Sequence, residues 1–143
     1  MGRKRSWQRL NIQFYIAGEI MAGELILIIE DNEKNRKLVR DVLNVKGYKT
    51  IESETAEDGL KLAIEKSPGL ILMDIQLPGM DGIAALKHLK TNSGTKSIPV
   101  IAITASAMNY NRVTMLAEGF DGYQTKPISV KDFLEEVRRV LGF

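Results

Sequence analysis

The sequence contains no cysteine and only one histidine, His88. Without thiols it has no disulfide, no nucleophilic cysteine and no cysteine-ligated zinc, and a reducing cytoplasm is the simplest compartment. A lone histidine defines no metal site, and beside Lys87 and Lys90 it fits a solvated helix face, so we assign it no role. No apolar run approaches the roughly 18 residues of a membrane span.

The chain also lacks an excess of charge of either sign from Glu24 onward. Of the 20 basic residues, four (Arg3, Lys4, Arg5 and Arg9) lie in the first nine positions, and from Glu24 onward 16 basic residues face 17 acidic ones. This balance gives little reason to expect nucleic acid as a partner. The length of 143 residues predicts one domain and leaves no room for a second folded one.

Short apolar runs alternate with longer amphipathic segments from residue 24 onward, which predicts an α/β fold. The expected strands are 25–30, 48–52, 70–74, 99–104 and 122–125. The runs "LILIIE" and "LILMD" are apolar at nearly every position, as in central strands of a parallel sheet that helices cover on both faces. The pattern predicts a (βα)₅ doubly wound parallel sheet.

The segments between the strands predict the helices. The first, at 32–46, carries Leu38, Val42 and Val45 on one apolar face. Helices are also expected at 83–90 and 107–118. The tetrapeptides "TAED", starting at Thr55, and "SVKD", starting at Ser129, have the form of capping boxes, which mark two further helix starts.

Acidic, hydroxyl and basic residues follow the expected strands. The residues at these ends are Glu30, Asp31, Asp74, Thr104 and Lys126. In doubly wound sheets a site lies beyond the carboxyl ends of the strands, so these side chains are expected to share one rim.

Three carboxylates on one rim require a compensating cation. Two carboxylates about 4 Å apart repel by roughly 4 kcal/mol at an effective dielectric near 20, and Mg²⁺ suits a few carboxylates together with phosphate oxygens. Lys126 and Thr104 are suited to stabilise phosphoryl oxygens. Asp74, at the centre, is then the candidate nucleophile that forms an aspartyl phosphate.

Four motifs carry a resemblance to a known family: "IIEDN" at 28–32, "LILMDIQLPGMDG" at 70–82, "IAITA" at 101–105 and "TKP" at 125–127. In this order and spacing they resemble the bacterial response-regulator receiver domain, over residues 24–143. The resemblance implies a flavodoxin-like sheet with strand order 2-1-3-4-5. "DIQLP", "ITASAM" and "KPIS" are similar to stand-alone cell-cycle phosphorelay regulators of the DivK type and to receivers attached to hybrid kinases.

The resemblance assigns roles to the acidic residues. Asp31 matches a direct Mg²⁺ ligand, and Glu30 matches an acid that acts mainly through metal-bound water. Asp74 matches the phospho-accepting aspartate, which is also a metal ligand. The backbone carbonyl of Gln76 matches the third protein ligand. Gln76 and Ser106 occupy two positions that modulate phosphoryl lifetime in the family.

Other residues match the switch of the family. Thr104 matches the switch hydroxyl, and Tyr123 matches the aromatic residue that turns inward when the threonine moves toward the phosphate. Lys126 matches the lysine that contacts the phosphoryl group. Pro127 matches a proline whose peptide bond with Lys126 is cis.

The function implied is phosphotransfer signalling without turnover of an external substrate. A histidine kinase or histidine phosphotransfer protein donates the phosphoryl group from a phosphohistidine, with Mg²⁺ as cofactor. A downstream protein, or onward phosphotransfer, then carries the signal. We expect a cytoplasmic monomer or weak dimer that binds no nucleic acid and catalyses only its own phosphoryl transfer and slow self-dephosphorylation.

Alternatives to this function remain open from the sequence. Taken singly, Asp31 fits a helix cap, Asp81 a cap or turn, Lys126 a solvated lysine and Thr104 an ordinary strand residue. A Mg²⁺-dependent phosphohydrolase of the haloacid-dehalogenase type would have a second aspartate where Gln76 stands. A receiver-like binding module without phosphorylation is the third possibility.

The N-terminal extension, residues 1–23, is assigned separately from the receiver domain at 24–143. A short amphipathic helix with a basic start, disorder, and an artefact of start-site choice or expression are all compatible with it. Met21 opens "MAGELILIIEDN", a natural start for a receiver, which favours the artefact.

Overall fold

The computed structural model describes residues 24–142, which form one parallel five-stranded sheet with order β2-β1-β3-β4-β5. The predicted fold class and strand order are confirmed. The elements are β1 (Leu25–Ile29), α2 (Glu33–Val45), β2 (Lys49–Ser53), α3 (Ala56–Lys66), β3 (Leu70–Asp74), α4 (Gly82–Thr91), β4 (Val100–Thr104), α5 (Arg112–Glu118), β5 (Gly122–Thr125) and α6 (Val130–Leu141).

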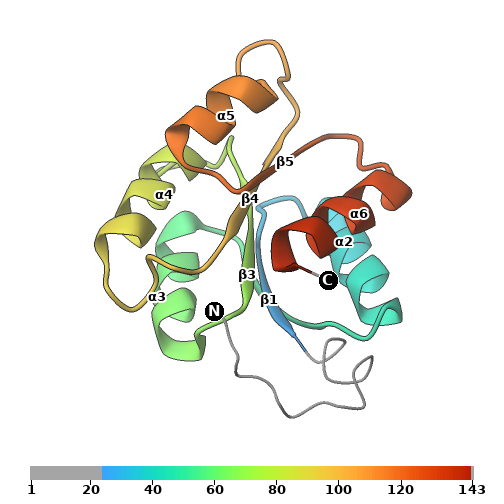
Figure 1. Ribbon diagram of the computed structural model, residues 1–143, viewed down its shortest axis with the longest axis horizontal. Helices are drawn as coiled ribbons and strands as arrows, with labels where there is room; N and C mark the ends of the chain where they lie inside the picture. Colours follow the sequence, from blue (N-terminus) through green and yellow to red (C-terminus); the bar gives the residue numbers. More distant parts are fainter. Residues whose placement is uncertain (1–23, 143) are drawn as a thin grey trace.

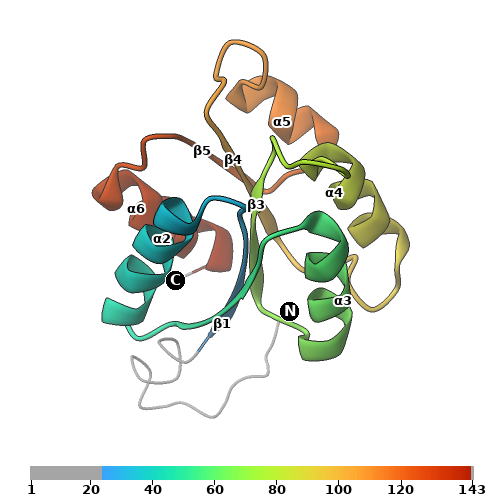
Figure 2. The same cartoon turned by 180° about the vertical axis from the view of Figure 1, so that it is seen from behind.

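Helices cover both faces of the sheet, with α3, α4 and α5 on one side and α2 and α6 on the other (Figures 1 and 2). Each layer has its own apolar core. Because β3 and β4 are interior strands that helices cover on both faces, every residue of these two strands is buried. The strands are therefore rigid supports for whatever lies at their carboxyl ends.

The buried face of helix α2 matches the predicted one only in part, since Val42 packs against the core as expected but Leu38 and Val45 do not. Val39 and Leu43 are buried against the sheet, whereas Leu38 is 40% exposed and Val45 is 83% exposed. Apolar residues at 38, 39, 42 and 43 form a stripe wider than the contact with the sheet, and the contact is centred on Val39 and Leu43. The sequence pattern predicts where the helix lies in the chain, but it does not determine which residues of a wide apolar stripe pack against the sheet.

Capping accounts for the helix starts, with one correction. Thr55 Oγ1 accepts a hydrogen bond from the Asp58 N–H at 3.1 Å, so the first capping box forms at least this half. Asp81 caps α4 by accepting from the Ala84 N–H at 2.9 Å. Ser129 is the N-cap residue of α6, but its side chain makes no capping hydrogen bond. The capping box predicted at Ser129 is therefore wrong.

Helix α5 starts five residues later than predicted. Asn111 caps it, since its Oδ1 accepts from the Thr114 N–H at 2.9 Å. The preceding residues form a turn in which the Tyr110 N–H donates to the Ser106 carbonyl at 2.9 Å. The capping bond of Asn111 fixes the start at Arg112, and residues 107–110 lead into the helix from the end of β4.

The predictions for the N-terminal extension, residues 1–23, lie outside the described residues. Within 24–142, none of the helices combines the length and the apolar character needed to cross a bilayer.

Candidate functional site at the carboxyl edge of the sheet

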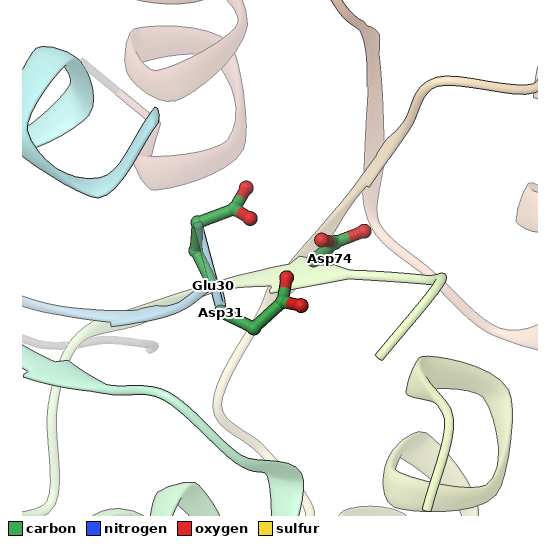
Figure 3. Close-up of side chains that lie close together, drawn as sticks. All are labelled: Glu30, Asp31 and Asp74. Carbon is green, nitrogen blue, oxygen red and sulfur yellow. The ribbon is translucent and has the colours of Figure 1, made fainter. Parts of the chain in front are cut away.

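Three carboxylates meet where the central strands end. Glu30 and Asp31 directly follow β1, and Asp74 is the last residue of β3. Ile29 pairs with Met73 in the parallel ladder, so Glu30 and Asp74 come next on neighbouring strands. One carboxylate oxygen from each of Glu30, Asp31 and Asp74 lies within 4.8 Å of the others. Figure 3 shows the three side chains close together. The structure thus brings together the acids that follow two different strands.

Lys126 supplies positive charge to this cluster. Its Nζ lies 2.8 Å from Glu30 Oε1 and 3.1 Å from Asp74 Oδ2. Glu30 is 4% exposed and Asp74 is 3% exposed, so both carboxylates are removed from water, whereas Asp31 is exposed. Because buried carboxylates need partners, the lysine stabilises the pair at the bottom of the site and leaves Asp31 at its rim.

The ionisation of Glu30 and Lys126 reflects this environment. Burial raises the pKa of Glu30 to about 7, and the hydrogen bond from Lys126 offsets only part of the effect. Burial disfavours the charged form of Lys126, but its hydrogen bond to Glu30 and the charge of Asp74 outweigh burial and raise its pKa. Lys126 therefore remains an ammonium group at neutral pH.

The loop after β3 holds Asp74 in one orientation. The Gln76 N–H donates to Asp74 Oδ1 at 3.0 Å, so both carboxylate oxygens have a donor. The chain then folds back, and the Gly82 N–H donates to the Ile75 carbonyl at 3.0 Å. A Cβ on Gly82 would lie 2.7 Å from the Asp74 carbonyl oxygen, so the close return of α4 requires glycine there.

The side chain of Gln76 reaches across the site to the loop after β4. Its Oε1 accepts a hydrogen bond from the Ala105 N–H at 3.2 Å. This contact was not predicted from the sequence, which gave no sign of the side chain's direction. The role of the Gln76 backbone carbonyl as a metal ligand stays a prediction.

Thr104 ends β4 with its side chain fully buried. Its Oγ1 accepts from the Ser106 N–H at 3.0 Å, and its carbonyl accepts from the Lys126 N–H at 2.8 Å. The second bond ties the end of β5 to the end of β4, which places Lys126 beside the carboxylates. The peptide bond between Lys126 and Pro127 is cis, the isomer that the family resemblance implies.

Tyr123 is buried on β5, at 7% exposure, and burial raises the pKa of its hydroxyl. The hydroxyl donates to the Tyr110 carbonyl at 2.6 Å, in the turn that precedes α5. The Arg112 guanidinium lies 5.5 Å from the ring centroid, and the Tyr123 N–H donates to Glu136 Oε2 at 2.8 Å. Arg112 also bonds Glu136, at 3.2 Å. Tyr123 is therefore held by both α5 and α6.

Sequence reasoning missed Glu136, Arg112 and one further residue, Arg36. The guanidinium of Arg36 donates to the Glu30 carbonyl at 2.8 Å and to Glu52 at 3.2 Å. All three look like ordinary charged residues of amphipathic helices. The one available signal was Glu52, whose position near the end of β2 points to the same edge of the sheet.

The donor set fits a hard divalent cation. Three carboxylate groups converge from two strand ends, one acid is exposed at the rim, and the three acids together carry more negative charge than Lys126 cancels. Oxygen ligands of this kind suit Mg²⁺, which retains several waters when protein carboxylates bind it. The residues present are therefore compatible with a magnesium site.

Comparison with known proteins gives a consistent match. The family model of the response regulator receiver domain matches residues 26–138. The polar-differentiation response regulator DivK of Brucella ovis is 44% identical over 117 residues, which cover 82% of this chain and 95% of that protein. DivK of Brucella anthropi matches with the same identity and coverage.

Solved structures match over most of the chain as well. The receiver domain of a sensor histidine kinase from Pseudomonas aeruginosa has a TM-score of 0.78 and 28% identity, covering 85% of this chain and 99% of its own; its structure contains a magnesium ion coordinated in the active site cleft. The receiver domain of a histidine kinase from Syntrophus aciditrophicus has a TM-score of 0.76 and 29% identity, covering 84% and 91% of the two chains.

Proposed function

This chain belongs to the response regulator receiver family, the phospho-accepting module of two-component signalling, and we propose that Asp74 accepts its phosphoryl group. The observation that carries the assignment is the orientation of Asp74: the carboxylate is buried at the end of β3, with one oxygen bonded by Gln76 N–H and the other by Lys126. A carboxylate fixed in this way is suited to in-line attack on phosphorus.

The proposed reaction is phosphotransfer from a phosphohistidine of a histidine kinase or histidine phosphotransfer protein. An Asp74 carboxylate oxygen forms the new bond to phosphorus, and the bond between phosphorus and the histidine nitrogen breaks. The imidazole leaves with the electron pair of that bond. Lys126 stays charged beside Asp74, so it balances negative charge on the phosphoryl oxygens as they approach.

Glu30, Asp31, Asp74 and the Gln76 carbonyl are the proposed Mg²⁺ ligands, with Glu30 acting mainly through metal-bound water. When bound, the ion supplies positive charge against the carboxylates and the phosphoryl oxygens. Lys126, 3.1 Å from Asp74, would then balance fewer carboxylate charges and would be available to the phosphoryl group. The acid at the rim, Asp31, faces solvent and is the group that an incoming ion meets first.

The proposed switch joins Thr104 to Tyr123. A phosphoryl group on Asp74 offers acceptor oxygens to the Thr104 hydroxyl, which is buried on the neighbouring strand. Movement of Thr104 shifts the loop of Ser106 and Tyr110, and the Tyr110 carbonyl is the acceptor for the Tyr123 hydroxyl. The change at Asp74 thereby reaches the surface formed by α5, β5 and α6.

We also propose the cellular setting. The protein acts in the cytoplasm as a monomer or weak dimer, binds a kinase or phosphotransfer protein and then a downstream protein target, and has no nucleic acid partner. It catalyses only its own phosphorylation and slow self-dephosphorylation. Identity of 44% across 95% of the DivK length supports a phosphorelay role of that kind.

Intact-mass analysis after incubation with acetyl phosphate and Mg²⁺ tests the assignment. We expect one added phosphoryl group that is labile at alkaline pH, none with Asp74→Asn, and the adduct still present with Asp81→Asn, a matched aspartate that caps α4. Adduct formation in Asp74→Asn would refute the assignment. Repeated turnover of p-nitrophenyl phosphate by the wild-type protein would favour the phosphohydrolase alternative instead.

A further inference from the structure

Arg36 lies outside the proposed reaction, yet it contacts the backbone of the acidic pair. It extends from the first turns of α2, and its side chain is only 12% exposed. Its Nη1 donates to the Glu30 carbonyl at 2.8 Å, while its Nε donates to Glu52 Oε1 at 3.2 Å. One guanidinium thus joins α2, the residue after β1 and the end of β2.

The Glu30 carbonyl belongs to the peptide group between the two acids. This group is planar and contains the Cα atoms of both Glu30 and Asp31. On the other side of Glu30, its N–H donates to the Ser53 carbonyl at 3.0 Å, which continues the pairing with β2. The bond from Arg36 therefore fixes the plane from which the Glu30 and Asp31 side chains diverge.

Glu52 orients Arg36 and also bonds a second arginine. Arg40 Nη1 lies 2.8 Å from Glu52 Oε2, whereas within residues 24–142 it is Arg36, and not Arg40, that donates to the Glu30 carbonyl. The Arg40 side chain is also more exposed, at 36% against 12%. Both arginines bind Glu52, but only Arg36 also bonds the backbone of the acidic pair. Comparing the two therefore separates the loss of an ion pair with Glu52 from the loss of the bond to the Glu30 carbonyl.

We propose that Arg36 is a positioning residue for the divalent cation, because it holds the Glu30–Asp31 peptide in the orientation that brings both carboxylates toward Asp74. This inference rests on the proposed function, since it requires that the acidic cluster binds Mg²⁺. Groups that orient metal ligands commonly affect metal affinity by about 10- to 100-fold. Glu52 acts one step further away, by orienting the guanidinium.

The test is calorimetric titration of Mg²⁺ into the full chain, which measures binding without phosphorylation. We expect Arg36→Met to raise the Mg²⁺ Kd by about tenfold, and Arg36→Lys to remain weak because an ammonium lacks the two-sided geometry of the guanidinium. Arg40→Met, the matched control, should stay within about twofold of wild type, since its ion pair with Glu52 is partly exposed and does not reach the acidic pair. Urea unfolding of each variant separates loss of fold from loss of affinity.

Phosphorylation by acetyl phosphate gives a second readout. In Arg36→Met the Mg²⁺ concentration for half-maximal rate should rise, and saturating Mg²⁺ should restore most of the maximal rate. If Arg36→Met does not fold, Glu52→Gln is tested in its place. It should raise the Mg²⁺ Kd by less than about tenfold, but by more than Arg40→Met does. Equal affinities in Arg36→Met and Arg40→Met would overturn the positioning role alone; absence of Mg²⁺ binding by the wild-type protein would overturn the proposed metal site as well.

Discussion

Lys126 and Asp74 are 52 residues apart in the chain, and their side chains meet with Nζ 3.1 Å from Oδ2. The same ammonium lies 2.8 Å from Glu30. Lys126 therefore occupies the position of a counter-ion for two buried carboxylates. It follows that a divalent cation bound to these carboxylates would compete electrostatically with Lys126.

Replacement of Lys126 by methionine should separate metal binding from phosphotransfer. Without the ammonium, Mg²⁺ would meet a more negative site, and the loss of one positive charge beside these carboxylates is worth on the order of 1 kcal/mol, or about a fivefold lower Kd. The phosphorylation rate should nevertheless fall by about 100-fold, because one group that stabilises the transferring phosphoryl oxygens is lost. Calorimetry with Mg²⁺ and intact-mass kinetics with acetyl phosphate measure the two effects.

Lys131→Met is the matched control for Lys126→Met, because Lys131 is an exposed lysine of α6 and its loss changes the net charge equally. It should leave both the Mg²⁺ Kd and the rate near their wild-type values. Weaker Mg²⁺ binding in Lys126→Met would contradict the proposed competition.

The bond between Gln76 Oε1 and the Ala105 N–H predicts an effect on phosphoryl lifetime. It joins the loops that follow β3, which ends at Asp74, and β4. One such bond contributes about 0.5 to 1.5 kcal/mol, so its removal should increase the fraction of molecules in which the two loops are apart by about 2- to 13-fold. In Gln76→Met we expect both phosphorylation by acetyl phosphate and loss of the phosphoryl group to accelerate within that range.

Gln76→Asn provides the control for the Gln76 prediction, since asparagine keeps the amide but is one methylene too short to reach Ala105. Both variants should behave alike in a time course on a phosphate-affinity gel. If dephosphorylation were faster in Gln76→Met but unchanged from wild type in Gln76→Asn, the polarity of residue 76, and not its bond to Ala105, would set the phosphoryl lifetime.

The sequence predicts most of the fold and the meeting of the acids for a simple physical reason. Continuous apolar runs such as residues 70–74 require cover on both faces, which implies parallel strands between helices. Parallel strands end at one edge, which predicts that Glu30, Asp74 and Thr104 share that edge. The sharing of one edge needs only the succession of strands and helices along the chain, which local patterns determine. The adjacency of β1, β3 and β4 in the sheet was implied by the family resemblance.

The remaining features depend on three-dimensional contacts that local patterns do not encode. Arg36 and Glu52 are 16 residues apart and lie on different elements, and nothing in their spacing distinguishes them from solvated charges. The covered face of α2 depends on how the helix sits on the sheet, which is why Val39 and not Leu38 is buried. Side-chain direction decides both cases, and it is fixed by packing.

Glu136 predicts an acid-sensitive contribution to stability. Burial alone would raise the pKa of this carboxyl, but the hydrogen bonds from Arg139 and from the Tyr123 N–H, with the charges of Arg139 and Arg112, outweigh burial and lower the pKa below its usual 4.5. A lowered folded-state pKa means that the unfolded state binds the proton more readily. The stabilisation is therefore present above about pH 4.5 and is lost as the pH falls through the folded-state pKa.

Urea unfolding followed by circular dichroism, from neutral pH down to about pH 3, tests this prediction for Glu136. The free energy of unfolding should be lower in Glu136→Gln than in the wild type at neutral pH, and the difference should shrink below about pH 4.5. Glu135→Gln removes an exposed carboxylate from the same helix and controls for the change in net charge. Parallel wild-type and Glu136→Gln curves over the whole range would mean that the carboxylate contributes through packing alone. A shrinking difference would instead show that its charge joins α5, β5 and α6 around Tyr123.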